Sequence, residues 1–93
     1  MNKLEISEIQ ILPVKPQNGL VAFCSFILNS QFYIGDVALY TRPDGLSYRL
    51  LYPTRKLPNG KIVSCFHPIS KQAGEEVEIA VTSKYIELIS KMS

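Results

Sequence analysis

Two prolines that flank a pair of adjacent cations constrain the fold most strongly. Proline fixes φ and donates no backbone hydrogen bond, so Pro53 and Pro58 exclude residues 52–60 from a helix interior and from the centre of a sheet. We therefore predict a stiff, exposed arm that presents Arg55 and Lys56 to solvent. Residues 57–60, Leu-Pro-Asn-Gly, have the composition of a turn and are expected to end this arm.

Segments with the composition of β-strands precede and follow the arm. Residues 4–13 alternate between apolar and polar side chains, with an irregularity at Ser7-Glu8, and predict a first strand with one buried face. Residues 20–28 are almost entirely apolar, as in a central strand buried on both faces. Residues 31–40 predict a third strand that Gly35-Asp36 interrupts. Short strands are expected at residues 47–52 and 61–66.

The connections between these strands are short. Residues 13–19 predict a turn that ends in Asn18-Gly19, a pair that tolerates the two positive φ angles of a type I′ hairpin. Asn29-Ser30 and residues 42–45 are expected to form the next two turns. In the fourth strand, alternation places Arg49 on one face and Tyr48, Leu50 and Tyr52 on the other. The first three strands should form an antiparallel meander.

The hydrophobic period changes to that of an amphipathic helix from about Ser70 onward. Ser70 is a candidate N-cap, Glu75, Glu76 and Glu78 lie where they would oppose the positive end of the helix dipole, and Lys91 lies late. The apolar stripe consists of Val77, Val81, Tyr85, Leu88 and Met92, widened by Ile86 and Ile89. The sequence thus predicts one α+β domain over residues 1–93, with an antiparallel sheet of about five strands and a C-terminal helix.

Cys24 and Cys65 both lie within apolar runs. No apolar leader opens the sequence and no segment is long and apolar enough to span a bilayer, so a reducing cytoplasm is the expected compartment. Both thiols are then expected to be buried and free, with a disulfide between two strands as the less favoured alternative.

The sequence carries no catalytic or metal-binding signature. His67 is the only histidine, and no spacing among it and the two cysteines resembles a zinc site. His67 could pair with Cys24, Cys65, Asp36 or a serine for nucleophilic catalysis, but no motif supports this. We expect its ring to bond a backbone group where the last strand leads into the helix. We predict no enzyme activity, catalytic residue, metal or cofactor.

Positive charge is concentrated in the middle of the chain. Lysine and arginine bind polyphosphates by displacing counterions, and an exposed tyrosine can stack on a base. Tyr40, Tyr48 and Tyr52 alternate with the cations, although each is more simply explained as a half-buried sheet residue. Between residues 42 and 61 a single acid, Asp44, opposes five cations: Arg42, Arg49, Arg55, Lys56 and Lys61.

The proline-flanked segment also resembles the SpoVG family of septation regulators. The matching motifs are Pro-Thr-Arg-Lys-Leu-Pro-Asn-Gly at residues 53–60, His-Pro-Ile at residues 67–69, and the apolar run at residues 32–37. Tyr85 stands in the helix where the family tends to have a tyrosine. The resemblance implies a small α+β protein, a cytoplasmic homodimer, and a regulator of septation or sporulation that binds DNA and RNA.

Carried to this chain, the resemblance implies nucleic-acid contacts by Arg55 and Lys56. Arg49 and Lys61, on the neighbouring predicted strands, are candidate flanking cations that could extend this pair into a basic stripe. Hydrophobic residues make up 46% of the chain, more than a small monomer readily buries, which also favours a homodimer. The alternative function is a protein–protein adaptor on the same fold without affinity for nucleic acid. Neither function involves a membrane or a small-molecule substrate.

Overall fold

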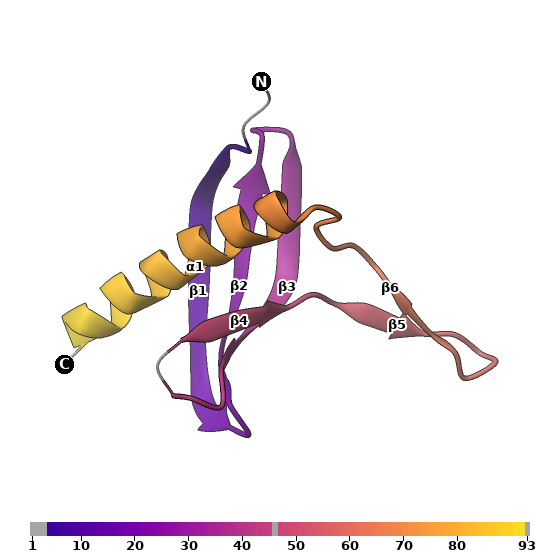
Figure 1. Ribbon diagram of the computed structural model, residues 1–93, viewed down its shortest axis with the longest axis horizontal. Helices are drawn as coiled ribbons and strands as arrows, with labels where there is room; N and C mark the ends of the chain where they lie inside the picture. The colour runs from indigo at the N-terminus through magenta and orange to yellow at the C-terminus, as the bar shows by residue number, and fades with distance from the viewer. Residues whose placement is uncertain (1–3, 46, 93) are drawn as a thin grey trace.

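A four-stranded antiparallel sheet and one helix packed across it form the body of the protein (Figure 1). The computed structural model describes residues 4–45 and 47–92. The predicted α+β class is confirmed, but the strands divide between two sheets rather than one. The larger sheet has the order β1-β2-β3-β4 and the smaller pairs β5 with β6. The elements are β1 (Ile6–Gln17), β2 (Leu20–Leu28), β3 (Phe32–Thr41), β4 (Tyr48–Leu51), β5 (Thr54–Lys56), β6 (Ile62–Ser64) and α1 (Lys71–Met92).

Strand β1 is longer than the sequence predicts. It continues to Gln17 through Pro13 and Pro16, where we expected a turn from residue 13 onward. Because β1 is an edge strand, a proline that donates no hydrogen bond is tolerated there. The turn is confined to Asn18 and Gly19, whose φ angles of 53° and 91° match the predicted hairpin.

The two predicted irregularities are confirmed. Glu8 has a φ of 48° where the pairing of β1 with β2 shifts register between Ser7 and Gln10. Asp36 has a φ of 60° where the pairing of β2 with β3 shifts register, one residue after Gly35. These bulges let the strands continue with their apolar residues on the same face.

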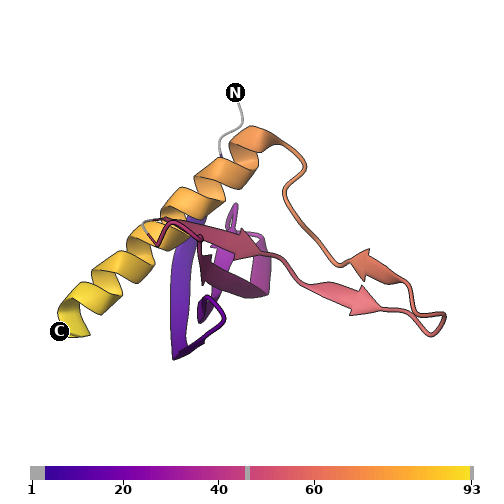
Figure 2. The ribbon, with the colours of Figure 1, turned by 60° about the horizontal axis from the view of Figure 1, so that its bottom comes forward.

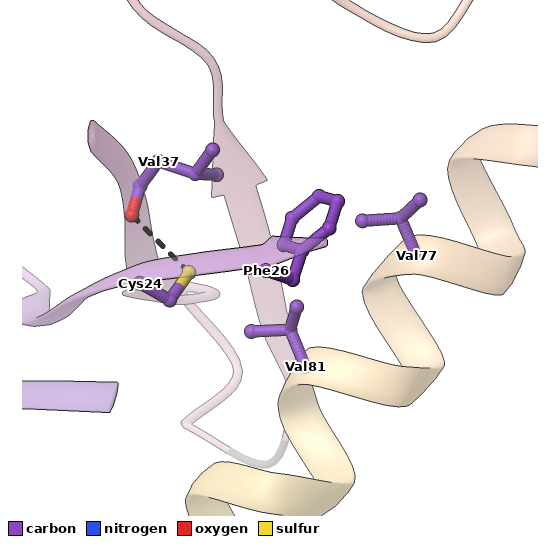
Figure 3. Packing of buried hydrophobic residues seen from close by; sticks show 5 residues of the cluster. All are labelled: Cys24, Phe26, Val37, Val77 and Val81. Carbon is purple, nitrogen blue, oxygen red and sulfur yellow. Dashed lines mark hydrogen bonds between the residues drawn. The ribbon is translucent and has the colours of Figure 1, made fainter. Parts of the chain in front are cut away.

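The main core lies between the sheet and α1. Cys24 and Phe26 of β2 and Val37 of β3 meet Val77 and Val81 of α1 (Figure 3). The same face continues to a second cluster in which Val21, Ala22 and Leu39 pack with Tyr85. The four-residue spacing from Val77 to Tyr85 therefore marks the buried stripe of the helix.

Helix α1 begins as predicted but its charges and stripe differ from the expectation. The Ser70 hydroxyl accepts a hydrogen bond of 3.0 Å from the Ala73 amide, which confirms the N-cap. The helix starts at Lys71, so Glu75, Glu76 and Glu78 lie beyond its first turn and too far along to neutralise the dipole.

Ile86 is 45% exposed and does not widen the buried stripe, whereas Ile89 packs against the core. The side chain of Met92 lies outside the described residues. None of the described helices has the length and hydropathy to cross a membrane.

Strand β2 is covered on one face only, contrary to the expectation that both faces are buried. Cross-strand pairing aligns Leu12, Phe23, Ala38 and Leu51 in one row across all four strands, on the face that α1 does not cover. Leu12 and Leu51 are 66% and 47% exposed. We call this side of the sheet the open face.

The two cysteines are both free but differ in environment. Cys24 is buried as predicted, and its thiol donates a hydrogen bond of 3.2 Å to the Val37 carbonyl. Cys65 is exposed, because the strand that precedes it belongs to the small sheet and has no core to enter.

Burial of Cys24 should make stability fall at high pH. Burial raises the pKa of the Cys24 thiol from 9.0 to about 11. The folded protein therefore holds this proton to higher pH than the unfolded chain, so the free energy of unfolding should decline as pH rises from about 9 to 11, by up to about 3 kcal/mol. Denaturant unfolding at pH 8, 9, 10 and 11, in a Cys65→Ser background, measures the decline. The Cys24→Ala variant should lack this part of it, and an equal decline in both proteins would contradict the assignment.

Candidate nucleic-acid interface

The proline-flanked segment forms one strand of a projecting hairpin. Strands β5 and β6 pair antiparallel and extend away from the sheet and from α1 (Figure 2). At the tip, the Leu57 amide donates to the Lys61 carbonyl at 2.7 Å, and the Gly60 amide donates to the Leu57 carbonyl at 2.9 Å. At the base, the Cys65 amide donates to the Pro53 carbonyl at 3.1 Å. We call residues 53–65 the arm.

Pairing within the arm separates its two adjacent cations. Arg55 lies opposite Val63, and Lys56 lies opposite Ile62. Successive residues of a strand point to opposite faces, so each face of the arm carries one cation beside one β-branched apolar side chain. All four of these residues are exposed. The sequence predicted the exposure correctly, and the pairing adds that the two adjacent cations start from opposite faces of the arm.

The two flanking cations occupy different places. Lys61 is exposed at the tip of the arm, where its amide donates to the Asn59 side-chain oxygen at 3.0 Å. Arg49 lies on β4 in the main sheet, with its guanidinium carbon 5.2 Å from the centre of the Tyr40 ring. Since Tyr40 pairs directly with Arg49, this cation–π contact lies on the open face. The structure therefore places Arg55, Lys56 and Lys61 on one hairpin and Arg49 on the sheet.

Arg42 belongs to neither group. Its guanidinium contacts a Glu78 carboxylate oxygen at 3.4 Å and donates to the Tyr48 carbonyl at 3.1 Å. The ion pair is solvent-exposed and contributes little stability, but it directs Arg42 toward the helix. One acid of α1, Glu78, thus pairs with a cation that directly follows β3, while the arm extends away from the helix (Figure 2).

The tyrosines considered for base stacking are half-buried, as their simpler explanation expects, with Tyr48 on β4 and Tyr52 directly after it. Tyr48 packs edge-on against Tyr85 with ring centres 5.5 Å apart, and Tyr52 packs against Phe66 at 6.1 Å. Burial, with smaller effects from nearby Cys24 and Glu78, raises the pKa of Tyr52 to about 12. The Tyr52 hydroxyl is buried without a hydrogen-bond partner. Neither of these two rings is presented for stacking.

His67 has the structural role that the sequence predicts. Its Nδ1–H donates to the Pro68 carbonyl at 2.9 Å, because a carbonyl oxygen can only accept. The bond lies between β6 and α1, in the connection that leads from the arm to the helix. Among the residues that the structure describes, no three potential metal ligands gather in one place.

The open face contains the exposed residues that sequence reasoning missed. Tyr33 is 71% exposed and pairs with Ile27, and Leu12 and Leu51 lie at the two ends of the apolar row. The sequence pattern could have identified these three residues, because each one alternates along its strand with residues that face the helix. What the sequence does not show is that the single helix leaves this face without a cover.

Comparison with known proteins gives a consistent result. The SpoVG family model matches residues 4–87. A protein of Finegoldia magna named "Putative septation protein SpoVG" is 32% identical over 90 residues, which cover 97% of this chain and 82% of the relative. A protein of the same name from Treponema denticola is 32% identical over 82 residues, covering 88% of this chain and 86% of the relative. A third, from Shouchella clausii, is 26% identical over 88% of this chain and 82% of the relative.

Proposed function

The chain belongs to the SpoVG family, and from this premise we propose that it is a cytoplasmic regulator that binds DNA or RNA through its arm. The observation that carries the proposal is the charge of the exposed arm. Arg55, Lys56 and Lys61 project on a hairpin that holds no acid. From residue 45 to residue 74 the sequence contains five cations and no carboxylate: Arg49, Arg55, Lys56, Lys61 and Lys71.

The geometry of the arm suits phosphate contact more than base recognition. Exposed lysine and arginine side chains gain affinity by releasing counterions from the polyphosphate, whatever the sequence. A hairpin is narrow enough to approach a groove, and its two adjacent cations start from opposite faces. Arg55 and Lys56 therefore make separate contacts in this proposal, with Lys61 at the tip and Arg49 on the sheet as secondary contacts.

The regulated process is proposed from the relatives. Their names refer to septation, and we extend that role to this chain as a homodimeric regulator without catalytic activity. His67, the side chain most suited to acid–base chemistry, bonds a backbone carbonyl in this structure.

Binding to random-sequence nucleic acid tests the proposal. Nuclease-treated protein should shift single-stranded DNA or RNA oligonucleotides at about 50 mM salt, with micromolar affinity that weakens steeply as salt rises. No shift of any pool at this salt would contradict it.

The adaptor function has one observation in its favour, the exposed apolar row of the open face. It predicts the opposite pattern, in which the protein binds no nucleic acid and a stoichiometric protein partner remains bound after nuclease treatment.

A further inference from the structure

The arm exposes apolar surface that nothing in its own chain covers. Ile62 is 68% exposed and Val63 is 40% exposed. The ladder of the arm consists of only three residue pairs, and an isolated two-stranded hairpin is marginal in water. A hairpin this short that extends away from its own core gains stability when one of its faces is buried against another surface (Figure 2).

The face of the arm with more to bury is the one that carries Ile62. Cross-strand pairing places Lys56 beside Ile62 on this face, and Arg55 beside Val63 on the other. Ile62 has the larger exposed fraction of the two apolar residues. A complementary surface for this face would offer an apolar hollow next to a carboxylate.

The open face of the sheet contains such a hollow. It has a volume of about 510 Å³ and lies at the bulge of β3, where Asp36 is exposed next to the apolar row. Its floor and rim include Gln10, Leu12, Phe23, Ser25, Tyr33 and Asp36. Phe23 and Leu12 supply an apolar floor, and Asp36 supplies a negative charge at the edge.

We propose that the arm of a second copy docks in this hollow, with Ile62 on the floor formed by Phe23 and Leu12 and with Lys56 paired to Asp36. The inference rests on the homodimer in the proposed function and specifies its interface. A two-fold axis lets each copy insert its arm into the other, so that one contact, made twice, covers the Ile62 face of the arm and the apolar row of the open face.

A second copy fits this hollow better than an unrelated partner does. The Ile62 face of the arm and the hollow belong to the same chain and are complementary in charge, with Lys56 on the first and Asp36 on the second, so self-association covers both at once. Docking also divides the arm between two tasks. In the dimer Lys56 faces the partner, so the phosphate contacts proposed for the arm fall to Arg55 on the opposite face and to Lys61 at the tip.

The first test compares two isoleucines of nearly equal exposure. Ile62 and Ile79 are 68% and 66% exposed, the first on the arm and the second on α1. Sedimentation without nucleic acid should show a dimer for the wild type at about 100 µM. Ile62→Gln should raise the dimer dissociation constant at least about 100-fold, because each dimer buries this side chain twice. Ile79→Gln should leave it within about threefold. A monomeric wild type, or equal effects of the two variants, would overturn the proposal.

The second test locates the arm on the partner. Cys65 is exposed and Cys24 is buried with a raised pKa, so a thiol-reactive spin label attaches selectively to Cys65 at the base of the arm. The labelled protein is mixed with isotope-labelled Cys65→Ser protein. The amide signals of Gln10, Ser25 and Tyr33 should broaden in the isotope-labelled copy, which carries no spin label. Broadening confined to α1 would place the arm elsewhere and reject the interface.

A double-mutant cycle tests the charge pair. Lys56→Met and Asp36→Asn should each weaken the dimer several-fold, and the double variant should be no weaker than either single variant. Asparagine tolerates the positive φ of Asp36, so this change preserves the bulge. Additive effects would exclude the pair. Because every measurement is made without nucleic acid, failure of the interface leaves the gel-shift test of DNA or RNA binding unaffected.

Discussion

Replacing Phe26 by alanine should lower the free energy of unfolding by about 3–5 kcal/mol, the range observed when a large aromatic side chain is removed from a core. Phe26 is 2% exposed and lies between the sheet and the helix, where it meets Val77 and Val81 (Figure 3). The loss comprises the transfer free energy of the ring and the cavity that it leaves.

This loss is large relative to the stability of a small domain, which is typically 5–15 kcal/mol. Denaturant unfolding at a fixed protein concentration measures it, since dimerisation would add a concentration-dependent term. Phe32→Ala is the matched control. Phe32 is 64% exposed at the start of β3, and its removal should cost less than about 1 kcal/mol. Similar losses for the two variants would show that the core does not lie between the sheet and α1.

Reversing the charge of Arg55 should weaken binding to nucleic acid at least tenfold at low salt. Arg55→Glu removes one phosphate contact and places a repelling carboxylate on the exposed face of the arm. The fold should be unchanged, because the side chain is exposed and makes no contact with the core.

Lys15→Glu is the control for this change. Lys15 is an exposed cation on β1, and its reversal changes the net charge by the same amount. If binding depends only on the net charge of the protein, the two variants should lose gel-shift affinity equally. If the arm contacts the nucleic acid, the loss should be small for Lys15→Glu and large for Arg55→Glu. Equal losses would count against the arm as the binding element.

The sequence predicts the features that depend on local chemistry. Asn18-Gly19 adopts the expected hairpin turn, Ser70 caps the helix, and the four-residue spacing of Val77, Val81 and Tyr85 identifies the side of α1 that faces the sheet. Each of these is decided by residues within one or two turns of the chain, so no tertiary information is required.

The sequence fails where the environment of a strand decides the outcome. Pro13 and Pro16 predict the end of a strand, yet they are compatible with β1 because it lies at the edge of the sheet. Cys65 lies in an apolar run and is nevertheless exposed, because its hairpin leaves the core. Arg55 and Lys56 are adjacent in sequence and exposed as predicted, but adjacency alone does not show which faces of the arm they occupy. Once the arm is a β-strand, its two-residue period assigns them to opposite faces.

The salt dependence of binding tests the central proposal most directly. For the wild type, the logarithm of the association constant should fall linearly with the logarithm of the salt concentration, with a slope of about −0.7 for each phosphate neutralised on single-stranded nucleic acid. Arg55→Ala should make this slope shallower by about 0.7, the contribution of one phosphate contact. It should also lower the affinity for every oligonucleotide to the same degree. If affinity and slope are both unchanged in Arg55→Ala, the arm does not contact phosphate and the proposed function is wrong.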